Sequence, residues 1–417
     1  MYAALRRRRA SDWVSHALAG LSARSQISGR DGAISCARAS ARRCAFTGAV
    51  LPNDTACYGT FDIPGLGPTR FYLSEPTGTN RSNQSDFRNA YWAASEVTKT
   101  TNGAFARITE TTNNTSHRLT APADFTPSGN TQYCVSFIVG PATTAPMVTV
   151  TISNSWITSR TVATANLSTG VVSGVSGAVF PLEDGSKLVS FYFTTIASPA
   201  INNVAVGMSI TGSEVYVGVG NFADIRDMMI EPGTIPNARI DTAGAAVTHN
   251  ADVIEWTPPT PIGSDCAIWG IYIPFGWSAA AGAVPPMSAP RLFEANSDVW
   301  RMYVTSTATL ERPDAVPAVK LIAISSIGQR THAVGNSFAA VTEGATCRVH
   351  HDLLSSAPSA SGVTPYPSAT TIRIGNRSGT DRPIRGAVCL GVASSITSIE
   401  LAALRVAALS LKNKFNP

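Results

Sequence analysis

Acidic side chains are the first candidates for chemistry in this chain of 417 residues. Hydrolysis of a glycosidic bond needs two carboxyl groups that flank the bond, roughly 5 to 9.5 Å apart. The nearest cluster of acids is Asp224, Asp227 and Glu231, at the exit of a strand-like run. Acids in such a place are mostly residues of solvated turns. We therefore expect no catalytic residue and predict that the protein is not an enzyme.

Motifs for nucleotide or metal chemistry do not occur in the sequence. Neither GxxxxGK[ST] nor HExxH is found. His350 and His351 are neighbours in a strand-like run, where adjacent side chains point to opposite faces and cannot easily reach one ion. We predict no metal site and no cofactor.

Aromatic side chains beside turn residues could bind a sugar. An exposed ring stacks on the C–H groups of a sugar, and nearby amides or carboxylates bind its hydroxyls. Trp156 follows a strand-like run, Trp277 lies in Phe-Gly-Trp-Ser, and Tyr366 lies between two prolines. These three are our candidate glycan-binding residues. The alternative is that they pack into the core or a subunit interface.

Positive charge is concentrated at the N-terminus. The formal net charge is +5, and the first 43 residues contain nine arginines against two aspartates. Arg6, Arg7, Arg8 and Arg9 are consecutive. Such a run is either a solvated tail or a surface for docking onto an acidic protein. No aromatic residues are interleaved with it, so we predict no nucleic-acid contact.

A short amphipathic helix is expected directly after this run, with Ser11 or Asp12 as its N-cap. Apolar residues recur there at helical spacing: Trp13, Val14, Ala17, Leu18 and Leu21. An apolar stripe of this kind needs a partner to cover it. We predict that the four arginines, with Trp13, Leu18 and Leu21, form a docking surface.

Most of the remaining chain has the pattern of β-strands. Period-two alternation occurs at 131–139, 147–152, 188–194 and 215–219, and strand-like runs follow at 267–275, 300–305, 319–325, 345–351 and 370–374. Thr397 and Glu400 fit a capping box that opens a terminal helix. The predicted fold class is all-β, with two tandem β-sandwich or jelly-roll domains, a short helical basic N-terminal arm and a C-terminal helix.

The boundaries follow from turn residues and changes of pattern. We predict a basic anchoring arm at 1–33, an extended collar or connecting segment at 34–85, a jelly roll at 86–235, a linker at 236–256, and a second sandwich with the C-terminal helix at 257–417. Within the linker region, His249, Asp252 and Glu255 are expected to be joint or surface residues.

The number and spacing of the cysteines and the hydropathy of the chain predict its redox environment and whether it crosses a membrane. The seven cysteines are scattered without a CxxC pair, and an odd number cannot close completely into intrachain disulfides. Reduced thiols in a protein made in a reducing cytoplasm are the simplest expectation. No apolar run approaches the roughly 20 residues needed to cross a bilayer, so we predict no membrane span.

Several segments resemble structural proteins of tailed bacteriophages. They include Arg38-Ala39-Ser40-Ala41-Arg42-Arg43, the segment 74–92 that ends in Asn-Ala-Tyr-Trp, the turn at 166–170, the joint at 244–253, and the late strands at 372–377 and 384–386. The matches occur in the order of that family over 34–405, and residues 1–33 lie outside them. The resemblance implies a carbohydrate-binding-module-like jelly roll followed by a concanavalin A-like, laminin G-like sandwich, as in head-spike and tail-fibre proteins.

The resemblance also implies a function. The expected protein is a virion component, such as a tail fibre, tail spike or head fibre, made in the cytoplasm of a bacterial host and placed on the surface of the tail or head. Its N-terminus would hold it to another virion protein (adaptor, portal, nozzle or capsid), and its lectin-like domains would adsorb to a host-surface glycan. We expect a homo-oligomer, with a trimer as one form. The alternatives are a purely structural decoration or fibre protein without a ligand and a glycan depolymerase.

Overall fold

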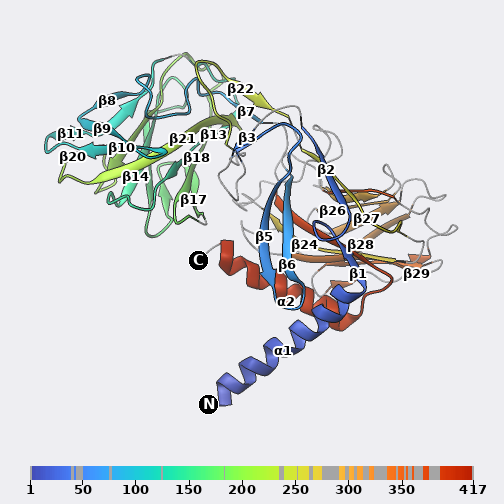
Figure 1. The fold of residues 1–417 in the computed structure, drawn as a ribbon. Helices are drawn as coiled ribbons and strands as arrows, with labels where there is room; N and C mark the ends of the chain where they lie inside the picture. Colours follow the sequence, from blue (N-terminus) through green and yellow to red (C-terminus); the bar gives the residue numbers. More distant parts are fainter. Residues whose placement is uncertain are drawn as a thin grey trace. The chain divides into compact units, whose positions relative to one another are not determined.

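The computed structural model forms two compact units, which are described separately below (Figure 1). Unit 1 contains Met1–Thr77 and Asn250–Pro417, and unit 2 contains Gly78–His249. The described residues are 2–38, 42–43, 50–74, 78–123, 125–182, 184–233, 239–250, 252–262, 266–274, 291–295, 300–304, 308–312, 319–323, 336–343, 346–351, 354–355, 359–360, 370–374 and 386–415. The protein is all-β with a helix near each end of the chain, as predicted.

Unit 2 is a sandwich of two antiparallel sheets. The first has the order β17 (Ser176–Pro181), β18 (Lys187–Thr194), β13 (Gln132–Val139), β21 (Phe222–Pro232), β10 (Phe105–Glu110) and β9 (Val97–Asn102). The second has the order β16 (Val172–Ser173), β15 (Thr161–Asn166), β14 (Met147–Ile152), β19 (Ala205–Ser209), β12 (Arg118–Thr120) and β8 (Ala93–Ser95). Two short ribbons complete it, β11 (Asn114–Ser116) with β20 (Val215–Val217) and β7 (Gly78–Asn80) with β22 (Val247–His249).

The core of unit 2 follows from the alternation within its strands. Val135 and Phe137 of β13 point inward, where Val148 and Val150 of β14 belong to the same buried cluster. Each such side chain contributes about 1.5–3 kcal/mol when it is fully buried. The strands predicted at 131–139, 147–152, 188–194 and 215–219 are confirmed as β13, β14, β18 and β20.

Unit 1 is built on two larger sheets. The first has the order β31 (Leu354–Ser355), β30 (Thr346–His351), β29 (Asn336–Glu343), β24 (Cys266–Pro274), β34 (Gly386–Ala393), β6 (Gly67–Ser74) and β5 (Cys57–Ile63), with β1 (Ser25–Ile27) on β34 and β32 (Ser359–Ala360) on β30. The second has the order β2 (Ala33–Ala37), β23 (Val253–Thr257), β33 (Ile372–Ile374), β25 (Arg291–Ala295), β26 (Trp300–Val304), β27 (Ala308–Arg312) and β28 (Val319–Ala323). β3 (Arg42–Arg43) pairs with β4 (Val50–Leu51).

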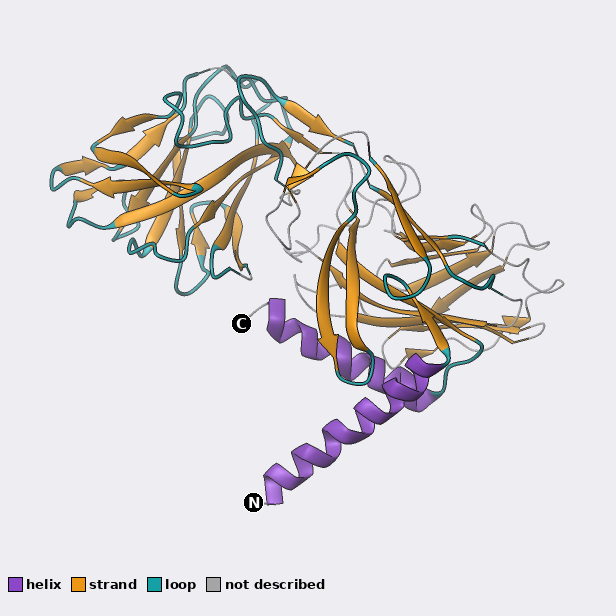
Figure 2. Ribbon diagram, in the orientation of Figure 1, coloured by secondary structure: helices purple, strands orange, loops and turns teal. Residues whose placement is uncertain are grey.

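Helix α2 and the C-terminal part of α1 pack on one face of the first sheet of unit 1 (Figure 2). Helix α1 (Tyr2–Ala23) contacts α2 (Ser398–Phe415), which also contacts β24 and β29. Alternate residues of β24, such as Trp269 and Ile271, join the core under the helices, and Ile268 and Tyr272 on the opposite face are buried as well. Strand β24 is therefore buried on both faces.

The capping box of α2 is confirmed. The backbone amide of Thr397 donates to Glu400 Oε2 at 2.8 Å, and the amide of Glu400 donates to Thr397 Oγ1 at 3.3 Å. The expected N-cap of α1 is wrong, because the helix runs through residues 11 and 12 and begins at Tyr2. The apolar spacing that predicted α1 is nevertheless correct, since Val14, Leu18 and Leu21 are buried.

The structure corrects the expected domain boundaries. The segment 34–85 is not a collar, because β2 pairs with β23 and β6 pairs with β34 in the sheets of unit 1. The jelly roll extends over Gly78–His249 rather than 86–235. The segment 236–256 is not a linker, because β22 pairs with β7 and β23 is a sheet strand. The two sandwiches are thus nested: unit 2 interrupts the sequence of unit 1.

The prediction that the linker residues lie at the surface is also wrong for individual side chains. His249 and Asp252 are fully buried, and Arg38 Nη1 lies 2.9 Å from Asp252 Oδ1. Glu255 is partly buried and pairs with Arg373 at 2.7 Å. Turn-rich sequence around these residues does not make them surface residues, because their partners come from distant segments.

The cysteines agree only in part with the expectation of reduced thiols. Cys36, Cys134, Cys266 and Cys389 are buried thiols. Burial raises the pKa of Cys389 to about 12, which leaves this thiol unreactive. Cys57 is disulfide-bonded, so the expectation is wrong at that position.

A buried carboxylate holds the β11–β20 ribbon in unit 2. Glu110 accepts hydrogen bonds from Tyr216 Oη at 2.6 Å and from the amides of Val219 and Asn221 at 2.7 and 2.9 Å. Burial raises the pKa of Glu110, but these donors lower it by more, so the pKa lies below its ordinary value of 4.5. The ionised carboxylate therefore stabilises the fold at pH values above about 4.5. This stabilisation is lost as the pH falls through the lowered pKa of Glu110.

We expect Glu110→Gln to destabilise unit 2 at pH 7 by about 1.5–3 kcal/mol, the contribution of hydrogen bonds to a charged group. The variant should also lose the part of the acid dependence that lies below about pH 4.5. Urea unfolding of the two proteins at pH 7 and at pH 3.5 measures both effects. Tyr216→Phe removes only one of the three donors and should cost less. Equal acid dependence in wild type and Glu110→Gln would contradict this account.

Candidate functional site

A shallow groove crosses the strand ends of unit 2 and has a volume of about 390 Å³. We call it the strand-end groove. Its lining residues are Gln132, Ile157, Thr158, Ser159, Thr161, Gly174, Val175, Ser176, Tyr192, Phe193 and Thr194. Its size is at the lower end of the range of small-molecule sites.

Neighbouring strands bring the groove residues together. Gln132 opens β13 and lies opposite Thr194, which ends β18, and Ser176 opens β17 opposite Tyr192. Gly174 makes the turn before β17 with φ +86°, and a Cβ there would lie 2.7 Å from the carbonyl oxygen of Val162. Only glycine fits this turn without strain. The rim of the groove is therefore set by backbone pairing.

Most polar side chains of the strand-end groove are not used inside the protein. Within the part of the chain that the structure describes, the side chains of five lining residues form no hydrogen bond: Gln132, Thr158, Ser159, Ser176 and Thr194. Thr161 Oγ1 donates to the carbonyl of Ser159 at 3.1 Å, and the hydroxyls of Tyr192 and Ser190 are 2.7 Å apart. Four hydroxyls and one amide are thus available to a ligand.

All lining residues of the groove are uncharged. The nearest arginine in the sequence, Arg160, forms an ion pair with Glu214, which also pairs with Arg118. One carboxylate is thus shared by two guanidinium groups, and neither arginine belongs to the lining of the groove. The lining residues can form hydrogen bonds to a polar ligand but themselves offer no counter-charge to an ionic one.

Trp156 lies in the core, which corrects its assignment as a sugar-stacking residue. Its side chain is fully buried and stacks on Phe193, with ring centroids 6.1 Å apart and an interplanar angle of 12°. The indole Nε1 donates to the carbonyl of Ala200 at 3.0 Å. The alternative that this aromatic packs into the core is the correct one. Trp277 and Tyr366 lie outside the described residues.

The acidic cluster is part of strand β21 and not of a solvated turn. Asp224 Oδ1 and Oδ2 accept hydrogen bonds from Arg107 Nε and Nη2, each at 2.8 Å, and Asn102 Nδ2 donates at 3.0 Å. Asp227 has φ +58° at a bulge in β21, and Glu231 is fully buried. Asp224 is thus committed to a structural ion pair. Among the described residues, no group of three or more His, Cys, Asp and Glu side chains could hold a metal ion.

The proposed docking helix is partly a core element. Leu18 and Leu21 are completely buried in unit 1, which corrects their assignment as docking residues, whereas Trp13 is 41% exposed. Arg6, Arg7, Arg8 and Arg9 lie in the first turns of α1, and their side chains are outside the described residues.

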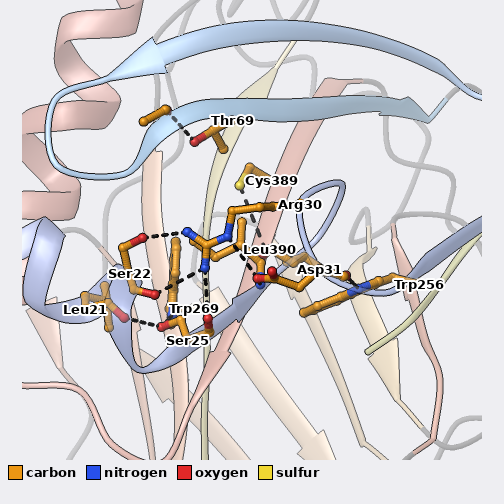
Figure 3. A network of polar contacts seen from close by, with 12 residues as sticks. Leu21, Ser22, Ser25, Arg30, Asp31, Thr69, Trp256, Trp269, Cys389 and Leu390 are labelled. Carbon is orange, nitrogen blue, oxygen red and sulfur yellow. Dashed lines mark hydrogen bonds and ion pairs between the residues drawn. The ribbon is translucent and has the colours of Figure 1, made fainter. Parts of the chain in front are cut away.

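A network of polar contacts fixes the exit of α1 (Figure 3). Arg30 donates to Ser22 Oγ at 2.6 Å, to the carbonyl of Ser25 at 3.0 Å and to Asp31 Oδ2 at 3.0 Å. Ser25 Oγ in turn accepts a hydrogen bond from Trp269 Nε1 at 3.1 Å. The C-terminal end of α1 is therefore attached to the sheet and does not form a free arm.

The exposed aromatic residue Tyr58 is not among the candidates predicted from the sequence. Tyr58 on β5 is 39% exposed, and the guanidinium of Arg70 lies 4.7 Å from its ring centroid. The alternating exposure of β5 places it on the outer face, and this alternation could have been read from Cys-Tyr-Gly-Thr-Phe-Asp-Ile. The strand-end groove had no such signal, because serine and threonine are abundant throughout the chain.

Within the described residues, neither helix is long and apolar enough to cross a membrane.

Among the comparisons with known proteins, only the search of solved structures finds similar chains. No protein-family model and no curated protein matches the sequence. Domain 4 of an extracellular GH43 arabinanase from Geobacillus stearothermophilus, in complex with arabinotriose, is 12% identical with a TM-score of 0.28, and the overlap covers 42% of this chain and 88% of that one. Mouse laminin alpha1 domains LG4-5 are 9% identical with a TM-score of 0.24, covering 66% and 84%. Trypanosoma rangeli sialidase is 11% identical with a TM-score of 0.27, covering 78% and 63%. TM-scores this low assign no function to the chain.

Proposed function

We propose that the protein is a virion component of a tailed bacteriophage that adsorbs to a glycan on the host surface. Unit 2 binds the glycan in the strand-end groove, and unit 1 attaches the protein to another virion protein through the N-terminal turns of α1. The observation that carries the glycan-binding part is the set of four hydroxyls and one amide in the groove that have no partner within the described part of the protein. Such groups match the alternating donors and acceptors of sugar hydroxyls.

Support for the virion part comes from the ordered resemblance of 34–405 to tailed-phage structural proteins. The exposed Trp13, one turn after the arginine run in α1, is consistent with a surface that a second protein covers. An anchored protein in many symmetric copies could bind a glycan through several weak contacts at once.

A glycan array with the full chain tests the adsorption role. We expect reproducible binding, reduced roughly threefold to tenfold by Thr194→Val, because one hydrogen-bonding group is lost. Thr98→Val is the matched control, since Thr98 is also an exposed threonine in the same sheet but lies on β9, outside the groove. A blank array would reject the adsorption role and favour a purely structural protein.

A further inference from the structure

We infer that the strand-end groove selects an uncharged saccharide and discriminates against acidic glycans. This inference rests on the proposed function, because it specifies the class of glycan that the same site takes. Three features of the groove carry it, namely its lack of charge, the type of its hydrogen-bonding groups and the nature of its apolar surface.

The lack of charge disfavours carboxylated, sialylated and phosphorylated sugars. A charged group that loses water on binding needs an opposite charge or several strong donors. The lining of the groove contains no lysine or arginine, and its donors are neutral hydroxyls and one amide. Arg160, next to Ser159 and Thr161 in the sequence, is held by Glu214, which it shares with Arg118. An acidic sugar bound to these residues would therefore lose hydration without gaining an ion pair from the lining, and the site would bind it less well than its neutral analogue.

The available hydrogen-bonding groups match neutral hydroxyls. Serine and threonine hydroxyls both donate and accept, and their hydrogens rotate to suit a partner. Gln132 adds one amide, which presents a donor and an acceptor to two adjacent hydroxyls of a sugar ring. Its place opposite Thr194 on paired strands puts both side chains on the same face of the sheet.

The larger apolar residues that line the groove are Ile157 and Val175, which are partly buried, and Tyr192 and Phe193, which are buried. Among the described residues of unit 2, no aromatic side chain is exposed enough to serve as a stacking platform. Stacking normally supplies much of the affinity of a sugar site. Binding at one groove should therefore be weak, and glycans must be presented at high density to detect it.

The test uses the full chain on dense arrays that pair each neutral glycan with an acidic derivative of the same backbone. We expect at least about tenfold stronger binding to the neutral member and a change of less than about twofold between roughly 50 mM and 0.5 M NaCl, because contacts without ions are not screened. Gln132→Ala should lower binding roughly threefold to tenfold.

Gln132→Lys provides the sharper test. A cation at the rim should shift the preference towards the acidic member of each pair and make that binding sensitive to salt. Thr98→Lys adds the same charge to the same sheet outside the groove and should leave the preference unchanged. Unchanged thermal unfolding confirms that each variant folds, as expected for exposed positions.

The outcomes separate this inference from the proposed function. Stronger binding of neutral glycans by the wild type, together with a shift towards acidic glycans in Gln132→Lys, supports the inference. Preferential binding of acidic glycans by the wild type, or glycan binding that no groove variant alters, overturns it and leaves adsorption standing. A blank array for all glycans overturns both.

Discussion

Deletion of residues 1–33 is expected to unfold unit 1. The deletion removes Leu18, Leu21 and Ile27, which are at most 1% exposed, and it removes β1 from its pairing with β34. Each of these side chains contributes about 1.5–3 kcal/mol when buried, and a whole domain is stable by only about 5–15 kcal/mol. Thermal unfolding and limited proteolysis should show loss of the cooperative transition of unit 1.

Replacement of Arg6, Arg7, Arg8 and Arg9 by glutamine is the matched control. Glutamine keeps the helical propensity of these turns and leaves the buried residues from Val14 onward in place. We expect this variant to fold like the wild type, so its incorporation into particles measures docking alone. A deletion of 1–33 that retained the wild-type transition of unit 1 would show that α1 and β1 are dispensable for folding.

Asp252→Ala is expected to destabilise unit 1 by about 3–5 kcal/mol, because it leaves the guanidinium of Arg38 buried without its carboxylate. Both side chains are at most 1% exposed, and Arg38 Nη1 lies 2.9 Å from Asp252 Oδ1. Arg38 also donates to the carbonyls of Pro52 and Thr55 at 2.8 and 3.0 Å. It therefore fixes the backbone at 52–55 in addition to pairing with Asp252. Denaturant unfolding with fluorescence detection measures the loss.

The pair Arg373 and Glu255 gives a control for Asp252→Ala. These two side chains also form an ion pair within unit 1, at 2.7 Å, but each is about one-third exposed. Glu255→Ala should therefore cost at most about 1 kcal/mol. Equal losses in Asp252→Ala and Glu255→Ala would contradict the role assigned to burial.

The fold class was predictable because it depends on local patterns. Period-two alternation located strands such as β13 and β14, and the spacing of Thr397 and Glu400 located the start of α2. The nesting of the two units was not predictable, because it depends on which strands pair. β6 finds its partner β34 more than 300 residues later, and no local pattern encodes that choice.

The candidate site was predicted less well, for the same physical reason. Turn residues beside Trp156 suggested exposure, but its burial is decided by Phe193 and Ala200, which lie on another strand and loop. Asp252 looked like a surface residue because Arg38 is 214 positions away in the sequence. The groove residues are ordinary serines and threonines, and only the pairing of β13, β17 and β18 brings them together.

The nested order of the units has a consequence for synthesis on the ribosome. The hairpin of β5 and β6 emerges early, but roughly 310 residues separate Ser74 from Gly386, its partner on β34, which is about 15–60 s at roughly 5–20 residues per second. All strands of unit 2 are complete by His249. Unit 2 can therefore fold while β6 still lacks its partner β34. During that interval the open edge of β6 could pair with another nascent chain. We therefore expect unit 1 to be completed last, by β34 and α2, and a chain truncated at residue 249 to contain all of unit 2 but only part of unit 1.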